Sequence, residues 1–342
     1  MRRVTAFAPG RVNAMGDHID YLGGLVLPLA LPQGTKVVME WMDGDTHRAT
    51  SVSHGQAHWP VGQPPTPSTQ WFDYCAGALA DLTQAVRIEI FSDLPQGAGL
   101  SSSASLLVAL ITARNALNQE GLSSLEIAQQ ARQVEVEHIG LNCGIMDQYA
   151  SAMGEAGHAM MLDCQALTHH PVRFGLGDAQ LWAIDSKAPR KLAGGVYNQR
   201  VQECSEIQTL AGSDHFFTMA PDLPAPLAGR LRHIQSEQRR VRLTANAASQ
   251  GDLATWGALM NESHQSLSHD YEVAGEALDT LQSALAATPG CYGARMTGGG
   301  FGGCVIALID RAAVAQARTA VAQQYGDTQW IECTPSDGAR LL

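Results

Sequence analysis

Four polar side chains near the start of the chain are suited to bind a hydroxylated ligand. Arg11, Asp17, His18 and Asp20 fall within ten residues, in the segment APGRVNAMGDHIDYLGG. Carboxylates and imidazoles offer the hydrogen-bonding groups that match sugar hydroxyls. The four glycines of this segment predict a loop, and a polar loop without a ligand is the competing interpretation.

A glycine- and serine-rich turn precedes a predicted helix in the segment LPQGAGLSSSASLL. Gly97 and Gly99 let the backbone bend tightly and approach a ligand closely. The helix would present unpaired N–H groups and a partial positive charge, and the hydroxyls of Ser101, Ser102 and Ser103 add donors. The turn therefore predicts a phosphate site, with a purely structural turn as the alternative. It lacks the lysine of a Walker A loop.

One carboxylate falls on the apolar side of a predicted helix over Ser123–His138. Ser123 and Glu126 form a capping box at its start. Glu135 shares a face with apolar residues, where an isolated carboxylate is costly to bury. It needs a partner, for which Mg²⁺ and a buried arginine are the alternatives.

A further glycine-rich segment, RMTGGGFGGC, comes directly before a predicted strand near the end of the chain. Five glycines within six residues are hard to explain as core. They suit a loop that approaches a nucleotide or a hydroxylated ligand, and a hairpin turn with bulges is the alternative.

The composition is that of an ordered, acidic protein. Its 342 residues, 45% hydrophobic and only 16% charged, exclude a disordered chain and suffice for two domains. With 33 acidic and 22 basic residues the net charge is −11, which argues against binding nucleic acid or an anionic membrane. We also expect no membrane-spanning segment, because no apolar stretch is long enough.

The seven cysteines are odd in number and widely spaced, without a C-x-x-C pair. A disulfide framework or a zinc cluster would need paired spacing. We therefore expect free thiols. Because the N-terminal segment MRRVTAFAPG lacks the apolar core of a secretory signal, we also expect a cytoplasmic protein.

The elements that must position these residues mix helices and strands without a regular alternation. A loop is expected over residues 53–69, a second irregular stretch over 211–228, and a domain boundary within 165–180. Strands are predicted at Lys36–Trp41, Val86–Phe91, His158–Asp163, Leu181–Asp185 and Cys304–Ile309. Besides Ser123–His138, helices are predicted at Ser102–Leu117, Asn198–Leu210 and Leu253–Ser268.

Five segments together resemble the GHMP small-molecule kinases, and among these the galactokinases. The segments are GRVNAMGDHIDYLGG, LPQGAGLSSSAS, NCGIMDQYASAMGEAGHAMMLDC, MNESHQSLSHDYEV and RMTGGGFGGC. The resemblance runs from Ala8 to about Ile309. It implies an α+β fold of two domains, placed here at residues 1–172 and 173–342, with the active site in the interdomain cleft.

The activity implied by the resemblance is phosphorylation of D-galactose at its C1 hydroxyl. ATP and Mg²⁺ would be required, and α-D-galactose 1-phosphate and ADP would be the products. The expected partners are therefore a sugar and ATP, bound by a monomer.

The resemblance also implies residue roles. Asp147 would be the catalytic aspartate beside the C1 hydroxyl and Arg11 would pair with it. Ser103 and Glu135 would bind Mg²⁺. The sugar site would comprise Asp17, His18, Asp20, Gly144, Asp147 and Tyr197. The nucleotide contacts would be Gly97, Gly99, Ser101, Ser102 and Ser103. Trp71 and Phe72 are aromatic residues that could hold adenine, with core packing as the expected role.

The chain departs from the family pattern at position 17, where galactokinases have Glu, and in VAGEALD, where the family usually has VSCPELD. The shorter Asp17 side chain puts the sugar in doubt. A 1-kinase for N-acetylgalactosamine, L-arabinose or another aldose is one alternative. A catalytically silent sensor of sugar and ATP is the other.

Overall fold

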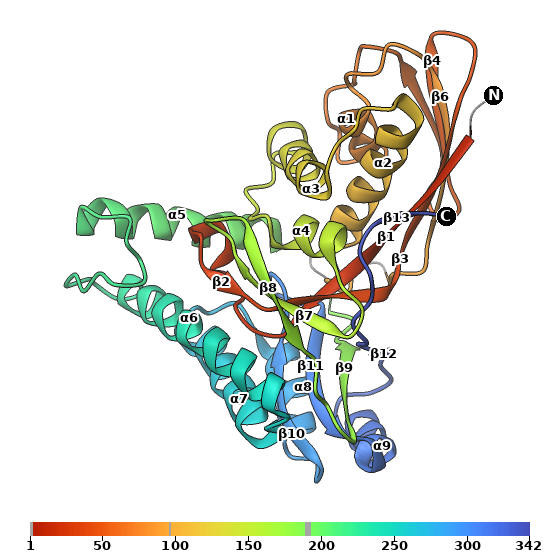
Figure 1. Cartoon of the computed structure of the whole chain (residues 1–342). Helices are drawn as coiled ribbons and strands as arrows, with labels where there is room; N and C mark the ends of the chain where they lie inside the picture. Colours follow the sequence, from red (N-terminus) through yellow and green to blue (C-terminus); the bar gives the residue numbers. More distant parts are fainter. Residues whose placement is uncertain (1–2, 96, 189–192) are drawn as a thin grey trace.

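A large sheet carries the N-terminal part of the computed structural model, which describes residues 3–95, 97–188 and 193–342. The strand order is β13-β1-β3-β6-β4-β5, and α1 (Asp73–Ala78) and α2 (Ser102–Asn118) cover one face (Figure 1). Alternate residues of the strands point into this core and toward solvent. The strands are β1 (Arg3–Asn13), β3 (Pro28–Trp41), β4 (Thr46–Ser51), β5 (Gly55–Pro60), β6 (Val86–Ser92) and β13 (Arg340–Leu341).

A second sheet, of four strands in the order β10-β11-β9-β12, lies at the bottom of Figure 1. Its strand β11 is buried at six of seven residues, as expected of a central strand that is covered on both faces. The strands are β9 (Ala179–Asp185), β10 (Cys291–Met296), β11 (Cys304–Asp310) and β12 (Trp330–Glu332). The helices of this region are α5 (Ala193–Ala211), α6 (Leu227–Gln250), α7 (Leu253–His269), α8 (Glu276–Ala286) and α9 (Val314–Gln324).

Helix α7 lies unusually close to β10. A Cβ atom on Gly257 would lie 2.2 Å from the carbonyl oxygen of Tyr292, and one on Gly293 would lie 2.0 Å from the carbonyl oxygen of Gly257. Both positions therefore require glycine, because backbone atoms cannot move aside as a flexible side chain can.

A third, three-stranded sheet lies between these regions, in the order β2-β7-β8. Its strands are β2 (Leu25–Val26), β7 (His158–Asp163) and β8 (Thr168–Arg173). Above it, α3 (Ser124–Gln133) continues directly into a π-helical segment, Val134–Ile139, and α4 (Met146–Met153) follows. The predicted helix over Ser123–His138 is therefore present, but its second part is π-helical instead of α-helical. Its predicted capping box at Ser123 is confirmed.

The predicted strands and helices are present, but four segments differ from expectation. The expected loop over 53–69 contains β5, which pairs with β4 and buries Trp59. The expected N-terminal loop begins as β1, so Arg11 lies on a strand. Strand β8 falls inside the expected boundary at 165–180, and α6, the longest helix described, was not expected.

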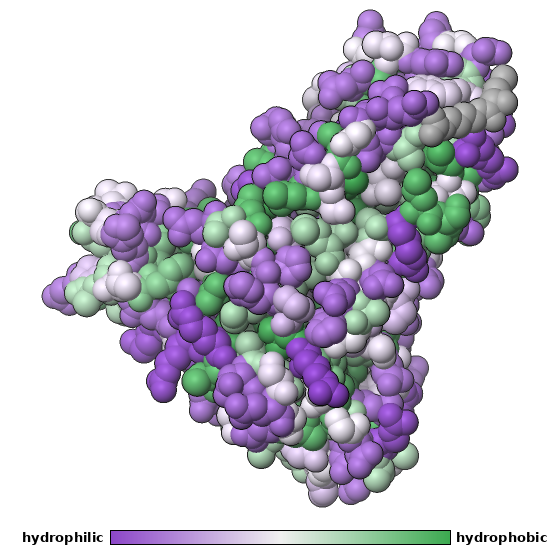
Figure 2. Space-filling model, in the orientation of Figure 1, coloured by the Kyte–Doolittle hydropathy of each residue, from purple (hydrophilic) through white to green (hydrophobic). Residues whose placement is uncertain are grey.

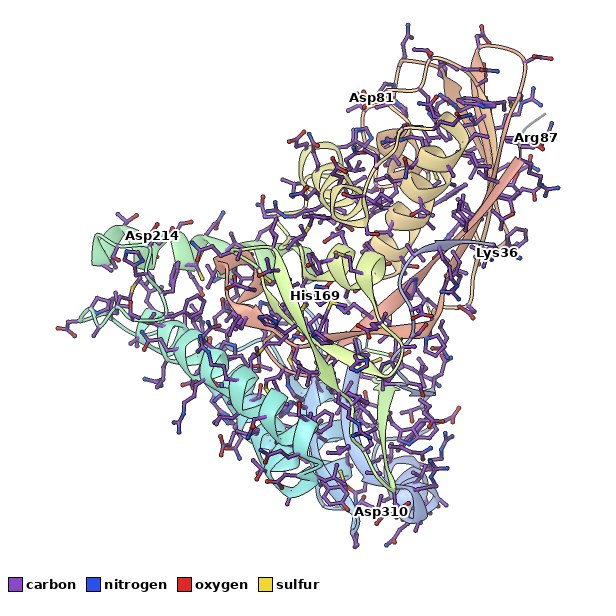
Figure 3. All side chains as sticks on the ribbon, in the orientation of Figure 1. Lys36, Asp81, Arg87, His169, Asp214 and Asp310 are labelled. Atoms are coloured by element: carbon purple, nitrogen blue, oxygen red, sulfur yellow. The ribbon has the colours of Figure 1, made fainter. Side chains whose placement is uncertain are left out.

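The division at residue 172 remains a prediction. The chain crosses it within β8, and the last strand, β13, returns to pair with β1 of the first sheet. Hydrophilic residues cover much of the visible face (Figure 2). The charged side chains of Lys36 and Arg87 project from the six-stranded sheet (Figure 3). Within the described residues, no helix has the length and hydropathy needed to cross a bilayer.

Candidate active site

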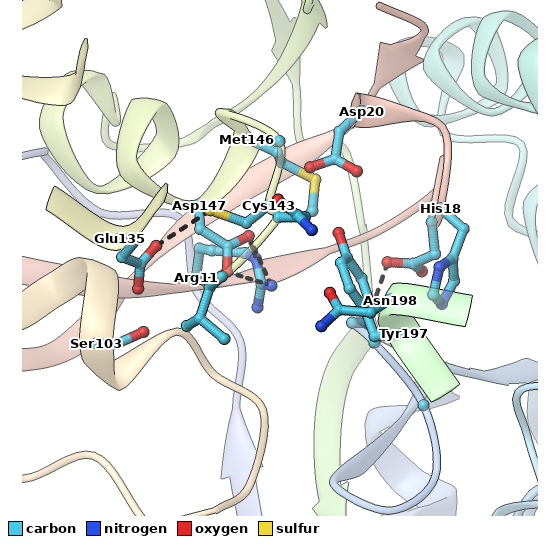
Figure 4. A pocket seen from close by; sticks show the side chains of 17 residues that line it. Arg11, His18, Asp20, Ser103, Glu135, Cys143, Met146, Asp147, Tyr197 and Asn198 are labelled. Carbon is cyan, nitrogen blue, oxygen red and sulfur yellow. Dashed lines mark hydrogen bonds and ion pairs between the residues drawn. The ribbon is translucent and has the colours of Figure 1, made fainter. Parts of the chain in front are cut away.

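A cavity of about 260 Å³ lies where β1, α2, the π-helical segment, α4, α5 and the β10–β11 hairpin meet. Figure 4 shows Arg11, Ser103, Glu135 and Asp147 on one side and His18 and Tyr197 on the other. Nine residues expected at the site line this cavity, namely Arg11, Asp17, His18, Asp20, Ser103, Glu135, Gly144, Asp147 and Tyr197.

Arg11 and Asp147 form a bidentate ion pair at the centre of the cavity. Arg11 Nε and Nη2 each donate to an oxygen of Asp147 at 2.8 Å, as the predicted pairing requires. The third nitrogen, Nη1, donates to the carbonyl of Gly99 at 2.8 Å. The buried arginine thereby fixes the carboxylate and ties it to the serine turn.

The three serines of that turn do not act alike. Ser101 Oγ donates to Asp147 Oδ2 at 2.6 Å, which differs from the expected phosphate contact. Ser101 is the residue before the first turn of α2, yet its side chain caps no N–H group of the helix. These N–H groups stay available to an anion. Gly97 and Gly99 have φ of +74° and +77°, where glycine is favoured, and neither lines the cavity.

Glu135 lies on the π-helical segment and is only 4% exposed. It accepts hydrogen bonds from Gln148 Nε2 and Cys143 Sγ, and no ion pair involving it is found among the described residues, so the expected alternative of a Glu–Arg pair is not supported. Burial raises the pKa of Glu135, while a hydrogen bond with the Ser103 hydroxyl opposes the rise. A divalent cation would stabilise the ionised form.

Ser103 and Glu135 fit a Mg²⁺ site. Both provide oxygen atoms, the carboxylate lacks a protein cation, and Mg²⁺ usually keeps several waters and phosphate oxygens as its other ligands. Within the described residues there is no cluster of three or more His, Cys, Asp or Glu side chains that could hold a metal. One carboxylate, one hydroxyl and a nucleotide would suffice.

Asp17 is 1% exposed and its carboxylate is fully engaged by the protein. Arg295 donates to Oδ2, while Asn13 Nδ2 and the Gly298 backbone N–H donate to Oδ1 at 3.1 and 3.0 Å. Arg295 also pairs with Glu237 at 3.4 Å. Asp17 thus joins the N-terminal segment to the glycine-rich hairpin at the cavity wall.

Glu237, on α6, is the second carboxylate of this buried network. Burial opposes its ionisation, but Arg295 and Arg240 outweigh that effect and lower the pKa of Glu237 to about 2. The carboxylate also accepts hydrogen bonds from Ser263 and from the Gly16 backbone N–H. A charged network therefore stands directly behind the wall of the cavity.

Asp20 and His18 face the other side of the cavity with unusual protonation. Burial, reinforced by repulsion from Asp147, raises the pKa of Asp20 to about 7. Burial, with repulsion from His233, lowers the pKa of His18 to about 3, so its imidazole is neutral at physiological pH. Gly144 packs against Asp20, since a Cβ there would lie 2.1 Å from Asp20 Oδ2.

A second cavity, of about 250 Å³, adjoins the first at the start of α2. Ser103 lines both cavities, and Ser102, Leu106 and Trp71 line the second. Trp71 packs against the core, as expected, and also lines this cavity. Phe72 instead lies near-parallel to Trp59 at 6.3 Å within the core, as expected.

Several lining residues escaped sequence reasoning. Asn198 follows Tyr197 on α5, and Asn142 precedes Cys143 in the segment NCGIMD. Their proximity to the residues named from the sequence was the available signal. The expected ligand-facing role of the glycine-rich hairpin agrees with the cavity, since Gly298, Gly299 and Gly300 line it.

Three family models match this chain. Residues 2–40 match the galactokinase galactose-binding signature, 72–155 the GHMP kinases N terminal domain and 244–327 the GHMP kinases C terminal domain. A galactokinase of Roseiflexus sp. (strain RS-1) is 37% identical over 97% of this chain and 91% of its own length.

Solved structures give the same result. Lactococcus lactis galactokinase complexed with galactose superposes with a TM-score of 0.93, at 30% identity, over 100% of this chain and 95% of that one. The Methanococcus jannaschii mevalonate kinase, at 17% identity over 98% of each chain, shares the fold with a TM-score of 0.73. The chain therefore belongs to the galactokinase family of GHMP kinases.

Proposed function

We propose that the protein phosphorylates D-galactose at its C1 hydroxyl with ATP, giving α-D-galactose 1-phosphate and ADP. The observation that carries this proposal is the position of Asp147. Arg11 and Ser101 hold its carboxylate between the hydroxyl-binding residues of the first cavity and the uncapped start of α2. The relatives that match along the chain are galactokinases, and one was solved with galactose bound.

In the reaction, the C1 oxygen of galactose attacks the γ-phosphorus of ATP, and the bond from that phosphorus to the β–γ bridging oxygen breaks. Asp147 orients the C1 hydroxyl and accepts its hydrogen as the oxygen–phosphorus bond forms. A carboxylate paired with Arg11 is a weak base, so positioning and electrostatic stabilisation supply most of the rate enhancement.

The sugar hydroxyls bind to the remaining polar groups of the first cavity. Asp20 accepts hydrogen bonds in its ionised form, and the neutral imidazole of His18 and the hydroxyl of Tyr197 complete the contacts. Asp17 contributes mainly by holding the cavity wall in place, because its oxygens already accept hydrogen bonds from Arg295, Asn13 and Gly298. Gly144 leaves the room that Asp20 needs.

ATP occupies the second cavity with its base and the start of α2 with its phosphates. Trp71 offers an aromatic face to the adenine, and the backbone of Gly97 and Gly99 shapes the turn that the phosphates approach. Ser102 and Ser103 present hydroxyls there. Ser103 and Glu135 would hold Mg²⁺, which would supply positive charge beside the phosphates.

We further propose that the protein works as a monomer in the cytoplasm. Six of the cysteines form no disulfide, as suits a reducing compartment, namely Cys75, Cys143, Cys164, Cys204, Cys291 and Cys333. The acidic net charge of −11 agrees with small-molecule substrates rather than nucleic acid or membrane partners.

A coupled ADP-release assay over a panel of aldoses tests the activity. We expect galactose to give the highest kcat/KM, and turnover to require Mg²⁺. A higher kcat/KM with N-acetylgalactosamine or L-arabinose would show that this sugar, and not galactose, is the substrate. The absence of turnover on every sugar, with sugar-dependent binding retained, would identify a sensor.

The Asp147→Ala variant tests the mechanism. We expect kcat to fall by about 10²- to 10⁴-fold, because the residue that orients the nucleophile is lost. Arg3→Ala, at an exposed ion pair far from the cavity, is the matched control and should retain full activity. Activity of Asp147→Ala within a few fold of the wild type would contradict the assigned role.

A further inference from the structure

The turn after α7, residues 270–273, supports the active-site cavity without lining it. Tyr271 is fully buried, its hydroxyl lies 2.6 Å from that of Tyr21, and its ring centre lies 5.0 Å from that of His18. The carbonyl of Val273 accepts a hydrogen bond from the Phe301 N–H at 2.8 Å. The turn therefore contacts both the His18 wall and the glycine-rich hairpin.

Two buried arginines hold this turn by three successive carbonyl groups. Arg230 Nη1 donates to the carbonyl of Asp270 at 2.6 Å. Arg200 Nε donates to the carbonyl of Tyr271 at 2.7 Å, and Nη2 to that of Glu272 at 3.1 Å. Cations are favourable here, because the C-terminal end of α7 carries a partial negative charge.

Glu203 joins the two arginines. Its Oε1 accepts from Arg200 at 3.0 Å and its Oε2 from Arg230 at 2.8 Å. Arg230 also donates to the Glu272 carboxylate at 2.7 Å, at a residue whose φ of +55° is unfavourable for a side chain other than glycine. The two guanidinium and two carboxylate groups therefore impose one conformation on the turn.

The same cluster reaches the wall of the cavity that α5 forms. Arg200 lies three residues after Tyr197 on α5, so the helix that presents Tyr197 and Asn198 is fastened to the turn by that arginine. In contrast, none of the hydrogen bonds that hold Asp147 involves residues 270–273. The cluster thus supports the sugar side of the site and leaves the catalytic pair to other contacts.

We propose that Arg230, acting through Glu203 and Arg200, is a positioning residue for sugar binding. It contacts no substrate. It holds the turn that orders His18, Tyr21, Tyr197 and the glycine-rich hairpin before the sugar arrives. Without it these walls become mobile, and the sugar has to order them on binding, which weakens affinity. This inference rests on the proposed binding of galactose in the first cavity.

Arg230→Met tests the proposal, with Arg232→Met as the matched control. Arg232 lies two residues further along α6, and its mostly exposed side chain pairs with the Asp270 carboxylate without reaching the backbone of the turn. We expect Arg230→Met to raise the galactose KM, and the Kd measured by calorimetry, about tenfold or more, with the KM for ATP and kcat within about threefold. Arg232→Met should leave all four unchanged.

Two further variants separate positioning from simple destabilisation. Arg230→Lys should recover part of the galactose affinity, because an ammonium keeps the charge but cannot reproduce the guanidinium geometry. Glu203→Gln keeps the packing and should raise the galactose Kd in the same direction by a smaller factor, so it serves if Arg230→Met does not fold.

An unchanged galactose Kd in Arg230→Met and Glu203→Gln would overturn the proposal. So would an equal loss of galactose and ATP affinity accompanied by a lower melting temperature, because that pattern indicates a structural role alone. If the wild type instead prefers another aldose, the proposed substrate fails, and the same comparison is made with that sugar.

Discussion

Asp147 has both carboxylate oxygens hydrogen-bonded before any ligand binds, because Arg11 and Ser101 approach it from two sides. The residue types at this site, and their resemblance to a known family, were evident from the sequence. The division of labour among the serines was not, because it depends on the backbone of Ser101, which has φ of +60°. That conformation turns its hydroxyl toward the aspartate.

The raised pKa of Asp20 predicts pH-dependent sugar binding. In the protein without sugar, the Asp20 carboxyl has a pKa of about 7. Ionised Asp20 is the better acceptor for sugar hydroxyls. Sugar binding below pH 7 therefore releases a proton from Asp20. We expect the galactose Kd to be constant well above pH 7 and to rise toward tenfold per pH unit well below it. Calorimetry over this range measures the slope.

Asp20→Asn is the control for this linkage. It should weaken galactose binding and remove the pH dependence, because an amide does not titrate. A wild-type Kd that stays flat through pH 7 would show that Asp20 is already ionised in the free protein, or that it does not contact the sugar.

At the scale of elements, regular apolar periodicity was a reliable guide and buried charge was not. α2 and α7 were predicted within one residue at each end. Helix α6 was missed because its inner face mixes the charged residues Arg230, Glu237 and Arg240 with the apolar ones. These charges interrupt the hydrophobic period in the sequence, and the ion-pair partners that allow their burial are distant in sequence.

The contact between α7 and β10 predicts a loss of stability for a substitution that helix propensity alone would make stabilising. Gly257→Ala in an unconstrained helix would stabilise by about 1 kcal/mol. Here the new Cβ would overlap the Tyr292 carbonyl, so we expect the free energy of unfolding to fall by about 1–3 kcal/mol in urea titrations.

The neighbouring Ala258 provides the comparison for Gly257, because it is exposed on the same helix. Ala258→Gly should cost about 1 kcal/mol through propensity alone. A Gly257→Ala protein more stable than the wild type would mean that α7 can move away from β10 without loss.

At the scale of the whole molecule, the cavity is assembled from distant parts of the chain. Arg11 and Asp147 are 136 residues apart, and Asn13 and Thr297, which bond to each other behind the wall, are 284 apart. Periodicity in single segments cannot supply such pairings. The two-domain expectation therefore came from resemblance of several segments together, which carries long-range information that local patterns lack.

Arg295 is a residue whose loss should lower the stability of the whole molecule. Arg295→Met leaves Asp17 buried without its cation and leaves Glu237 with Arg240 alone, and we expect the free energy of unfolding to fall by about 3–5 kcal/mol at neutral pH. The deficit should shrink as the pH falls, because the unpaired Asp17 carboxylate can then be protonated. Denaturant titrations at several pH values measure both effects.

Arg3→Met is the matched control, since it breaks only the exposed pair with Glu89 and should change stability by less than about 1 kcal/mol. An Arg295→Met protein as stable as this control would show that the buried network adds nothing to the fold.

The arrangement of aromatic residues gives the two ligands different optical signatures. Of the six tryptophans, all of them described, Trp71 borders the second cavity and none borders the first, whose aromatic residues are His18 and Tyr197. Tryptophan fluorescence should therefore change when the nucleotide binds and change little when the sugar binds. A fluorimeter could thus record one binding step in the presence of the other, without any attached dye.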